Sequence, residues 1–73
     1  MIVKLIGWEE GMQKISLTKL QMEFFELSLK EAKTNVDKLL DGNTIEIEVK
    51  SDTKAKHFIR KASDIGVLCY LAD

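Results

Sequence analysis

Side chains that commonly carry out catalysis are sparse in this 73-residue chain. It holds one histidine, His57, one cysteine, Cys69, and carboxylates that are spread along the sequence. Catalysis needs a nucleophile beside an oriented base, or a metal ion with three or four ligands. Glu9 and Glu10 are adjacent, which is typical of a solvated turn, and the sequence has neither a glycine-rich phosphate loop nor a Cys-x-x-Cys motif. We therefore expect a non-enzymatic protein that needs no metal or cofactor.

Basic residues make up the two groups that remain as candidates for binding a partner. One group lies on two predicted helices, outside their apolar stripes. Its members are Lys14, Lys19, Lys30 and Lys33. The other group clusters on a third predicted helix, where it suggests contacts with an RNA backbone. Its members are Lys54, Lys56, Arg60 and Lys61. The net charge of -1 and the neighbouring Asp52 and Asp64 argue against general nucleic-acid affinity, so RNA binding is the alternative function.

The first 27 residues predict a strand and a helix. Residues 2–6 form a β-branched and aliphatic run that ends at Gly7, which predicts a strand. A turn is expected over residues 8–14, and a helix from Ile15 to Phe25 or Glu26. Its apolar residues are spaced by three and four, as a buried helix stripe requires. They are Leu17, Leu20, Phe24 and Leu27.

A second helix is predicted to begin after Ser28, because Ser28 and Glu31 have the spacing of a capping box. Gly42 is expected to end it in the left-handed conformation. Lys30 and Lys33 are expected at the edge of its apolar face, with Lys33 able to pair with Asp37. The residues of that face are Leu29, Ala32, Val36, Leu39 and Leu40.

Strict alternation over residues 44–50 predicts a half-buried strand in which Ile45, Ile47 and Val49 face the core and Glu46 and Glu48 face solvent. A third helix follows a cap at residues 51–53, and residues 67–72 predict a final strand. The inward stripe of this helix contains Ala55, Phe58, Ile59, Ala62 and Ile65.

These elements predict a single α+β domain over residues 1–73, in the order β-α-α-β-α-β. We expect two layers: a three-stranded antiparallel or mixed sheet with three helices on one face. Neither a signal peptide nor a membrane span is apparent, and the single cysteine suits a reducing cytoplasm.

The segment "KISLTKLQMEFFELSLKEAKTNVD", from Lys14 to Asp37, resembles the C-terminal domain of the bacterial ribosomal stalk protein without a gap, and "LKEAK" is identical to the family's motif. The later "AKHFIRKASDIGV" is similar to that family's A-E-x-x-K-x-x-L-E-E-A-G-A. The resemblance implies the fold given above, which is shared with the adaptor of the Clp protease.

The resemblance also implies a binding surface for translation factors on the first two helices. Lys14, Lys19, Lys30 and Lys33 match the family's lysines, whereas Thr18 and Met22 occupy its isoleucine and arginine positions. A polarizable methionine among lysines is suited to bind an acidic amphipathic helix of a partner protein. We therefore predict a protein-interaction module whose surface comprises Lys14, Thr18, Lys19, Met22, Lys30 and Lys33. A weak homodimer is also expected, because the outer sheet face or a strand edge should leave apolar residues exposed.

Overall fold

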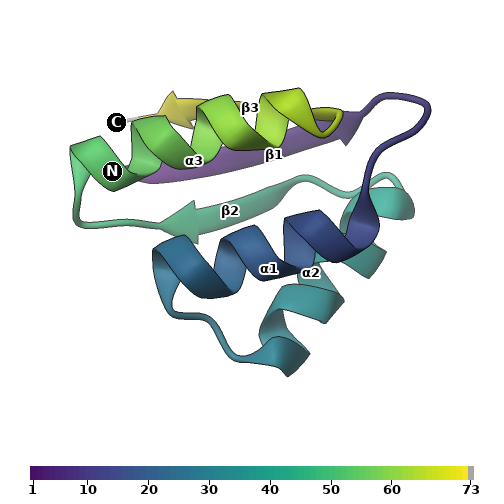
Figure 1. Ribbon diagram of the computed structural model, residues 1–73, viewed down its shortest axis with the longest axis horizontal. Helices are drawn as coiled ribbons and strands as arrows, with labels where there is room; N and C mark the ends of the chain where they lie inside the picture. Colours follow the sequence, from purple (N-terminus) through teal and green to yellow (C-terminus); the bar gives the residue numbers. More distant parts are fainter. Residues whose placement is uncertain (73) are drawn as a thin grey trace.

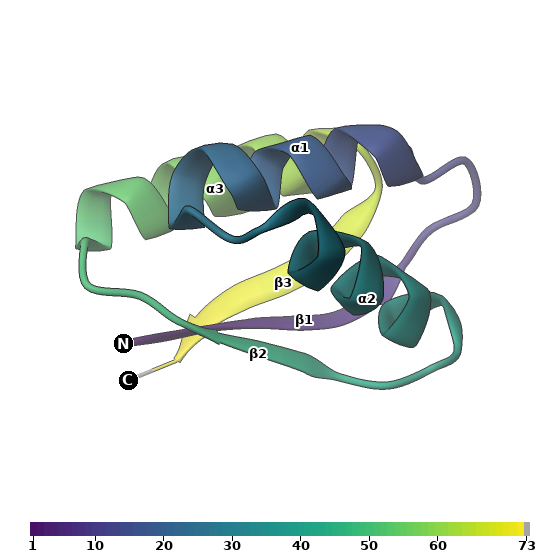
Figure 2. The ribbon, with the colours of Figure 1, turned by 90° about the horizontal axis from the view of Figure 1, so that it is seen from below.

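The structure, a computed structural model, describes residues 1–72. It has the predicted order β-α-α-β-α-β and the predicted α+β class (Figure 1). Figure 2 shows the three helices on the same side of the sheet. The elements are β1 (Ile2–Trp8), α1 (Lys14–Phe25), α2 (Leu29–Leu40), β2 (Ile45–Glu48), α3 (Asp52–Asp64) and β3 (Val67–Ala72).

The sheet is antiparallel throughout, with the strand order β2-β1-β3. The central strand β1 places Val3 opposite Ile47 of β2 and opposite Leu71 of β3. Since successive side chains of a strand point to opposite faces, Val3 and Leu5 are fully buried while Ile6 is exposed. The alternation predicted for β2 is confirmed, because Ile45 and Ile47 are buried and Glu46 and Glu48 are exposed.

Phe58 of α3 lies at the centre of the core and is fully buried. Its ring lies 4.5 Å from that of Phe25 and 6.2 Å from that of Phe24, measured between centroids, so the end of α1 is packed against α3. Ala55 and Ala62, one turn on either side of Phe58, are also fully buried. The predicted stripe of α3 is therefore confirmed, and it brings α1 and α3 side by side over the sheet.

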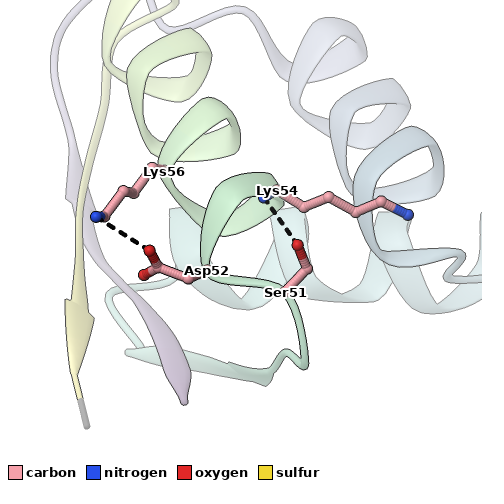
Figure 3. Close-up of polar contacts among 4 residues, drawn as sticks. All are labelled: Ser51, Asp52, Lys54 and Lys56. Atoms are coloured by element: carbon pink, nitrogen blue, oxygen red, sulfur yellow. Dashed lines mark hydrogen bonds and ion pairs between the residues drawn. The ribbon is translucent and has the colours of Figure 1, made fainter.

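Two helix starts were correctly predicted. The Ser28 hydroxyl oxygen accepts a hydrogen bond from the Glu31 amide at 3.1 Å, and the Ser51 hydroxyl oxygen accepts one from the Lys54 amide at 3.2 Å (Figure 3). Each bond satisfies one of the free N–H groups in the first turn of its helix. Gly42 has a φ of 95°, as expected for the residue that ends α2.

Three expectations were wrong. β1 continues to Trp8 instead of ending at residue 6, because a bulge between Leu5 and Gly7 lets the strand keep pairing with β3. Leu29 is 50% exposed, since as the first residue of α2 it lies beyond the edge of the core. Within residues 1–72 the ion pairs are Lys4–Glu46 and Lys56–Asp52, so Lys33 and Asp37 are not paired.

Candidate protein-binding surface on α1 and α2

An exposed apolar pair occupies the solvent-facing side of α1. The side chain of Ile15 is 74% exposed and that of Met22 is 37% exposed. They are seven residues apart, which is close to two helical turns, so both lie on one side of the helix. Lys19 is exposed on the turn between them, and Lys14 is exposed at the start of the helix. Glu23, the residue after Met22, is exposed on this side as well, so this side of α1 combines apolar surface with two lysines and one carboxylate.

Thr18 does not belong to this surface, although it was predicted as part of its centre. It is only 8% exposed, and its hydroxyl donates a hydrogen bond to the main-chain carbonyl of Lys14 at 3.1 Å. A threonine in a helix commonly satisfies its hydroxyl in this way, through the carbonyl four residues earlier. The apolar centre is instead formed by Ile15 and Met22.

Gln21 fixes the position of α2 beside α1 and was missed in the sequence. It is fully buried, and its side-chain nitrogen donates to the carbonyl of Ala32 on α2 at 3.1 Å. Its oxygen accepts a hydrogen bond from the side-chain nitrogen of Asn35, also on α2, at 2.8 Å. The only signal in the sequence was a polar residue one turn after Leu17, within an apolar stripe.

The lysines of α2 lie on a helix that packs directly against α1. Lys30 and Lys33 are both exposed. Lys30 lies in the first turn of α2, where the positive end of the helix dipole disfavours cations by a few tenths of a kcal/mol, whereas Lys33 lies in the second turn, where this effect has fallen off. The dipole of α2 therefore gives no reason for the charge of Lys30 and gives Lys33 no stabilisation.

A groove of about 350 Å³ runs between α1 and α3. Leu20 and Ile65 supply its apolar surface, while Lys19 and Lys61 border it from the two helices. Lys61 also lies over the ring of Phe24, with its nitrogen 5.6 Å from the centroid. The groove extends the α1 surface toward α3, a connection that the sequence did not indicate. The remaining lining residues are Ser16 and Asp64.

A second groove, also about 350 Å³, lies between the end of α1 and the start of α3. Phe24 and Phe25 form its aromatic part. Two acidic and two basic side chains line it, so it has no dominant charge. These are Glu26, Glu48, Lys50 and Lys54.

The basic residues of α3 do not form a single stripe. Figure 3 shows Lys54 and Lys56 pointing to opposite sides of the helix. The Lys56 nitrogen pairs with Asp52 at 3.0 Å, and Lys61 borders the groove beside Asp64. Arg60 is exposed. A nucleic-acid backbone needs a continuous positive surface, which these four residues do not provide together.

Neither the cysteine nor the histidine lines the two grooves. Burial raises the pKa of the Cys69 thiol from 9.0 to about 11, and a thiol with so high a pKa is a weak nucleophile at neutral pH. His57 is exposed on α3. Among residues 1–72, no three His, Cys, Asp or Glu side chains lie together as a metal site would require.

None of the helices described in residues 1–72 is long and apolar enough to cross a membrane. Comparisons with protein families, with curated proteins and with solved structures found no match for the chain. The resemblance to the ribosomal stalk domain stays a prediction from the residues quoted above.

Proposed function

We propose that this protein is a non-catalytic interaction domain that binds an acidic, amphipathic helix of another protein along α1. The observation that carries the proposal is the exposure of Ile15 and Met22 on one side of α1 with Lys19 between them. Large apolar side chains on a positively charged helix face suit a partner that has apolar residues beside carboxylates.

The apolar residues of the partner would cover Ile15 and Met22. Its carboxylates would meet Lys14 and Lys19 on α1. Burial of Met22 and Ile15 would then supply most of the residence time, because lysines at the rim of an interface act mainly on the association rate and its salt dependence.

Lys30 and Lys33 would extend the positive rim across α2. The packing of α2 against α1, to which Gln21 contributes a hydrogen bond, holds the helix that carries these lysines beside the helix that carries Ile15 and Met22. Because Lys30 opposes the α2 dipole and Lys33 gains nothing from it, a role in attracting an acidic partner accounts for both better than helix stability does.

The resemblance to the ribosomal stalk domain supports this choice of surface and suggests a translation factor in the cytoplasm as the partner. The observed element order is the one that the resemblance implies. Met22 stands where the stalk family has an arginine, and methionine lacks the planar set of hydrogen-bond donors of the guanidinium group. The partner's contact at this position would therefore be apolar.

The test is affinity capture followed by quantitative mass spectrometry with four proteins. They are the wild type, the Ile15→Ser, Met22→Ser variant, the Lys30→Glu, Lys33→Glu variant, and a control with the same charge change at two exposed lysines outside the proposed surface, Lys38→Glu in the last turn of α2 and Lys50→Glu after β2. Circular dichroism verifies that each variant is folded.

We expect the first two variants to lose the same set of partners by at least about tenfold and the control to retain them. Equal capture by all four proteins would place binding away from α1 and α2. Ribonuclease-sensitive capture that persists in both surface variants would favour the RNA alternative on α3.

A further inference from the structure

The two edges of the sheet differ in charge and length. The strand order leaves β2 and β3 with unpaired sides. β2 is four residues long and carries Glu46 and Glu48, whereas β3 is six residues long and contains no charge and no proline. Charged residues and short length are what protect strand edges from pairing with another chain. The edge of β3 has neither protection.

The free side of β3 presents main-chain groups from alternate residues. The carbonyl of Gly66 accepts a hydrogen bond from the amide of Glu9. The Val67 N–H belongs to the same planar, trans peptide unit as this carbonyl, so it points the opposite way, toward the free edge. Alternation then directs the main-chain groups of Cys69 and Leu71 to that edge as well.

Apolar side chains continue from this edge across the outer face of the sheet, away from the helices. Leu68 and Tyr70 of β3 are 44% and 45% exposed, and Ile6 of β1 is 52% exposed. Leu68 lies beside Gly7, where an added Cβ would be 3.4 Å from the Leu68 side chain. Lys4 separates Tyr70 from β2, since it pairs with Tyr70 on one side and with Glu46 on the other.

We propose that two copies of this chain associate through β3, so that the two three-stranded sheets form one continuous antiparallel sheet around a twofold axis. Placing Cys69 opposite Cys69 of the second copy pairs residues 67–71 along their length. Leu68 then lies opposite Tyr70 of the second copy on the outer face, and an aromatic side chain beside an aliphatic one stabilises a strand pair.

Charge favours the β3 edge over the β2 edge and over the outer face for such a pairing. Pairing through β2 would bring Glu46 and Glu48 of the two copies together, and packing of the outer faces would bury Lys4 with its 3.8 Å ion pair. Pairing through β3 opposes only uncharged side chains. On α3, Lys56 points toward this side in Figure 3 and is paired with Asp52, while Arg60, one turn later on the same side, is exposed and must stay in solvent when the strands pair. A net charge of -1 per copy adds little repulsion.

The interface is small, so the dimer is weak. Five residues of strand span about 17 Å. A contact of that length across two layers buries on the order of 700 Å² in total, below the roughly 1,200 Å² of a stable complex. We therefore expect a dissociation constant on the order of 100 μM.

Sedimentation equilibrium between about 10 μM and about 1 mM tests the proposal, because this range brackets the expected constant. The Leu68→Glu, Tyr70→Glu variant places like charges opposite each other and should weaken the dimer by at least about tenfold. The Leu68→Lys, Tyr70→Glu variant places opposite charges there in both pairs and should restore it. Ile6→Glu puts a charge on the outer face away from the edge and should leave the dimer unchanged.

A monomeric wild type at the highest concentration would overturn the proposal. So would dissociation by Ile6→Glu with no effect of the paired glutamates, which would place the contact on the outer face. The register is tested in a Cys69→Ala background by mixing a Leu68→Cys chain with a Tyr70→Cys chain under mild oxidation. A disulfide-linked heterodimer is expected, and cross-linking of either chain with itself at the same rate would contradict the register.

Discussion

The side chain of Gln21 on α1 donates a hydrogen bond to the main-chain carbonyl of Ala32 on α2. This bond, at 3.1 Å, joins two helices at a point where both residues are fully buried. A buried amide must satisfy its polar atoms, and Gln21 does so only when α2 is in its observed position. The contact therefore specifies how α2 lies beside α1, and with it the placement of Lys30 and Lys33.

Gln21→Ala should lower the free energy of unfolding by about 2 to 3 kcal/mol, because it removes buried hydrogen bonds and leaves a cavity. Urea denaturation followed by circular dichroism measures this loss. Asn35→Ala is the control. Because Asn35 is half-buried, a water molecule can take its place as the donor to the Gln21 side-chain oxygen, so this substitution should lower the free energy of unfolding by about 1 kcal/mol or less. Equal losses for the two variants would contradict the central role of Gln21.

The elements were predictable from the sequence because their signals are local. Ser28 and Glu31 mark the start of α2 with a spacing of three residues, and Gly42 supplies the conformation that ends it. The alternation from Ile45 to Val49 fixes which side of β2 faces the core. Each signal depends only on neighbours in the chain, so it can be interpreted without the tertiary structure.

The candidate surface was only partly predictable, because it depends on contacts between elements. Thr18 is buried by the packing of α1, and nothing within its own helix indicates that. Gln21 appears polar in sequence, yet its partners on α2 lie eleven and fourteen residues away. The α1–α3 groove joins Lys19 to Lys61, two residues separated by most of the chain. Propensity and periodicity carry no information on such pairs.

Ile15 and Leu17 should respond in opposite ways to substitution although both are aliphatic residues of α1. Leu17 is fully buried, so Leu17→Ala should cost about 3 kcal/mol in the free energy of unfolding. Ile15 is 74% exposed, and Ile15→Ser should change stability by about 0.5 kcal/mol or less. Urea denaturation of both variants checks the pair. A large loss for Ile15→Ser would mean that Ile15 packs in the fold and is not free to bind a partner.

Gly66 and Gly11 both have positive φ, 91° and 90°, but differ in their surroundings. A Cβ added at Gly66 would lie 3.1 Å from the Cα of Met12. A Cβ added at Gly11 would point into open space, with no contact within 4 Å. Gly11→Ala should therefore cost about 1 kcal/mol from the backbone alone, and Gly66→Ala clearly more. Thermal unfolding of the two variants provides the comparison. Equal shifts in melting temperature would show that the turn around Met12 moves away without cost.

The Cys69 thiol should make the stability of the protein depend on pH in alkaline solution. Burial raises its pKa from 9.0 to about 11, so between these values the folded chain keeps a proton that the unfolded chain has released. The stabilising contribution is fully present below pH 9 and is lost as the pH rises toward 11. The measurement is the difference in unfolding free energy between the wild type and Cys69→Ala, taken by urea denaturation at pH 8, 9, 10 and 11, so that only the effect of the thiol is compared. This difference should shift steadily against the wild type above pH 9, and a constant difference across the range would show that the thiol is as accessible to water in the folded chain as in the unfolded one.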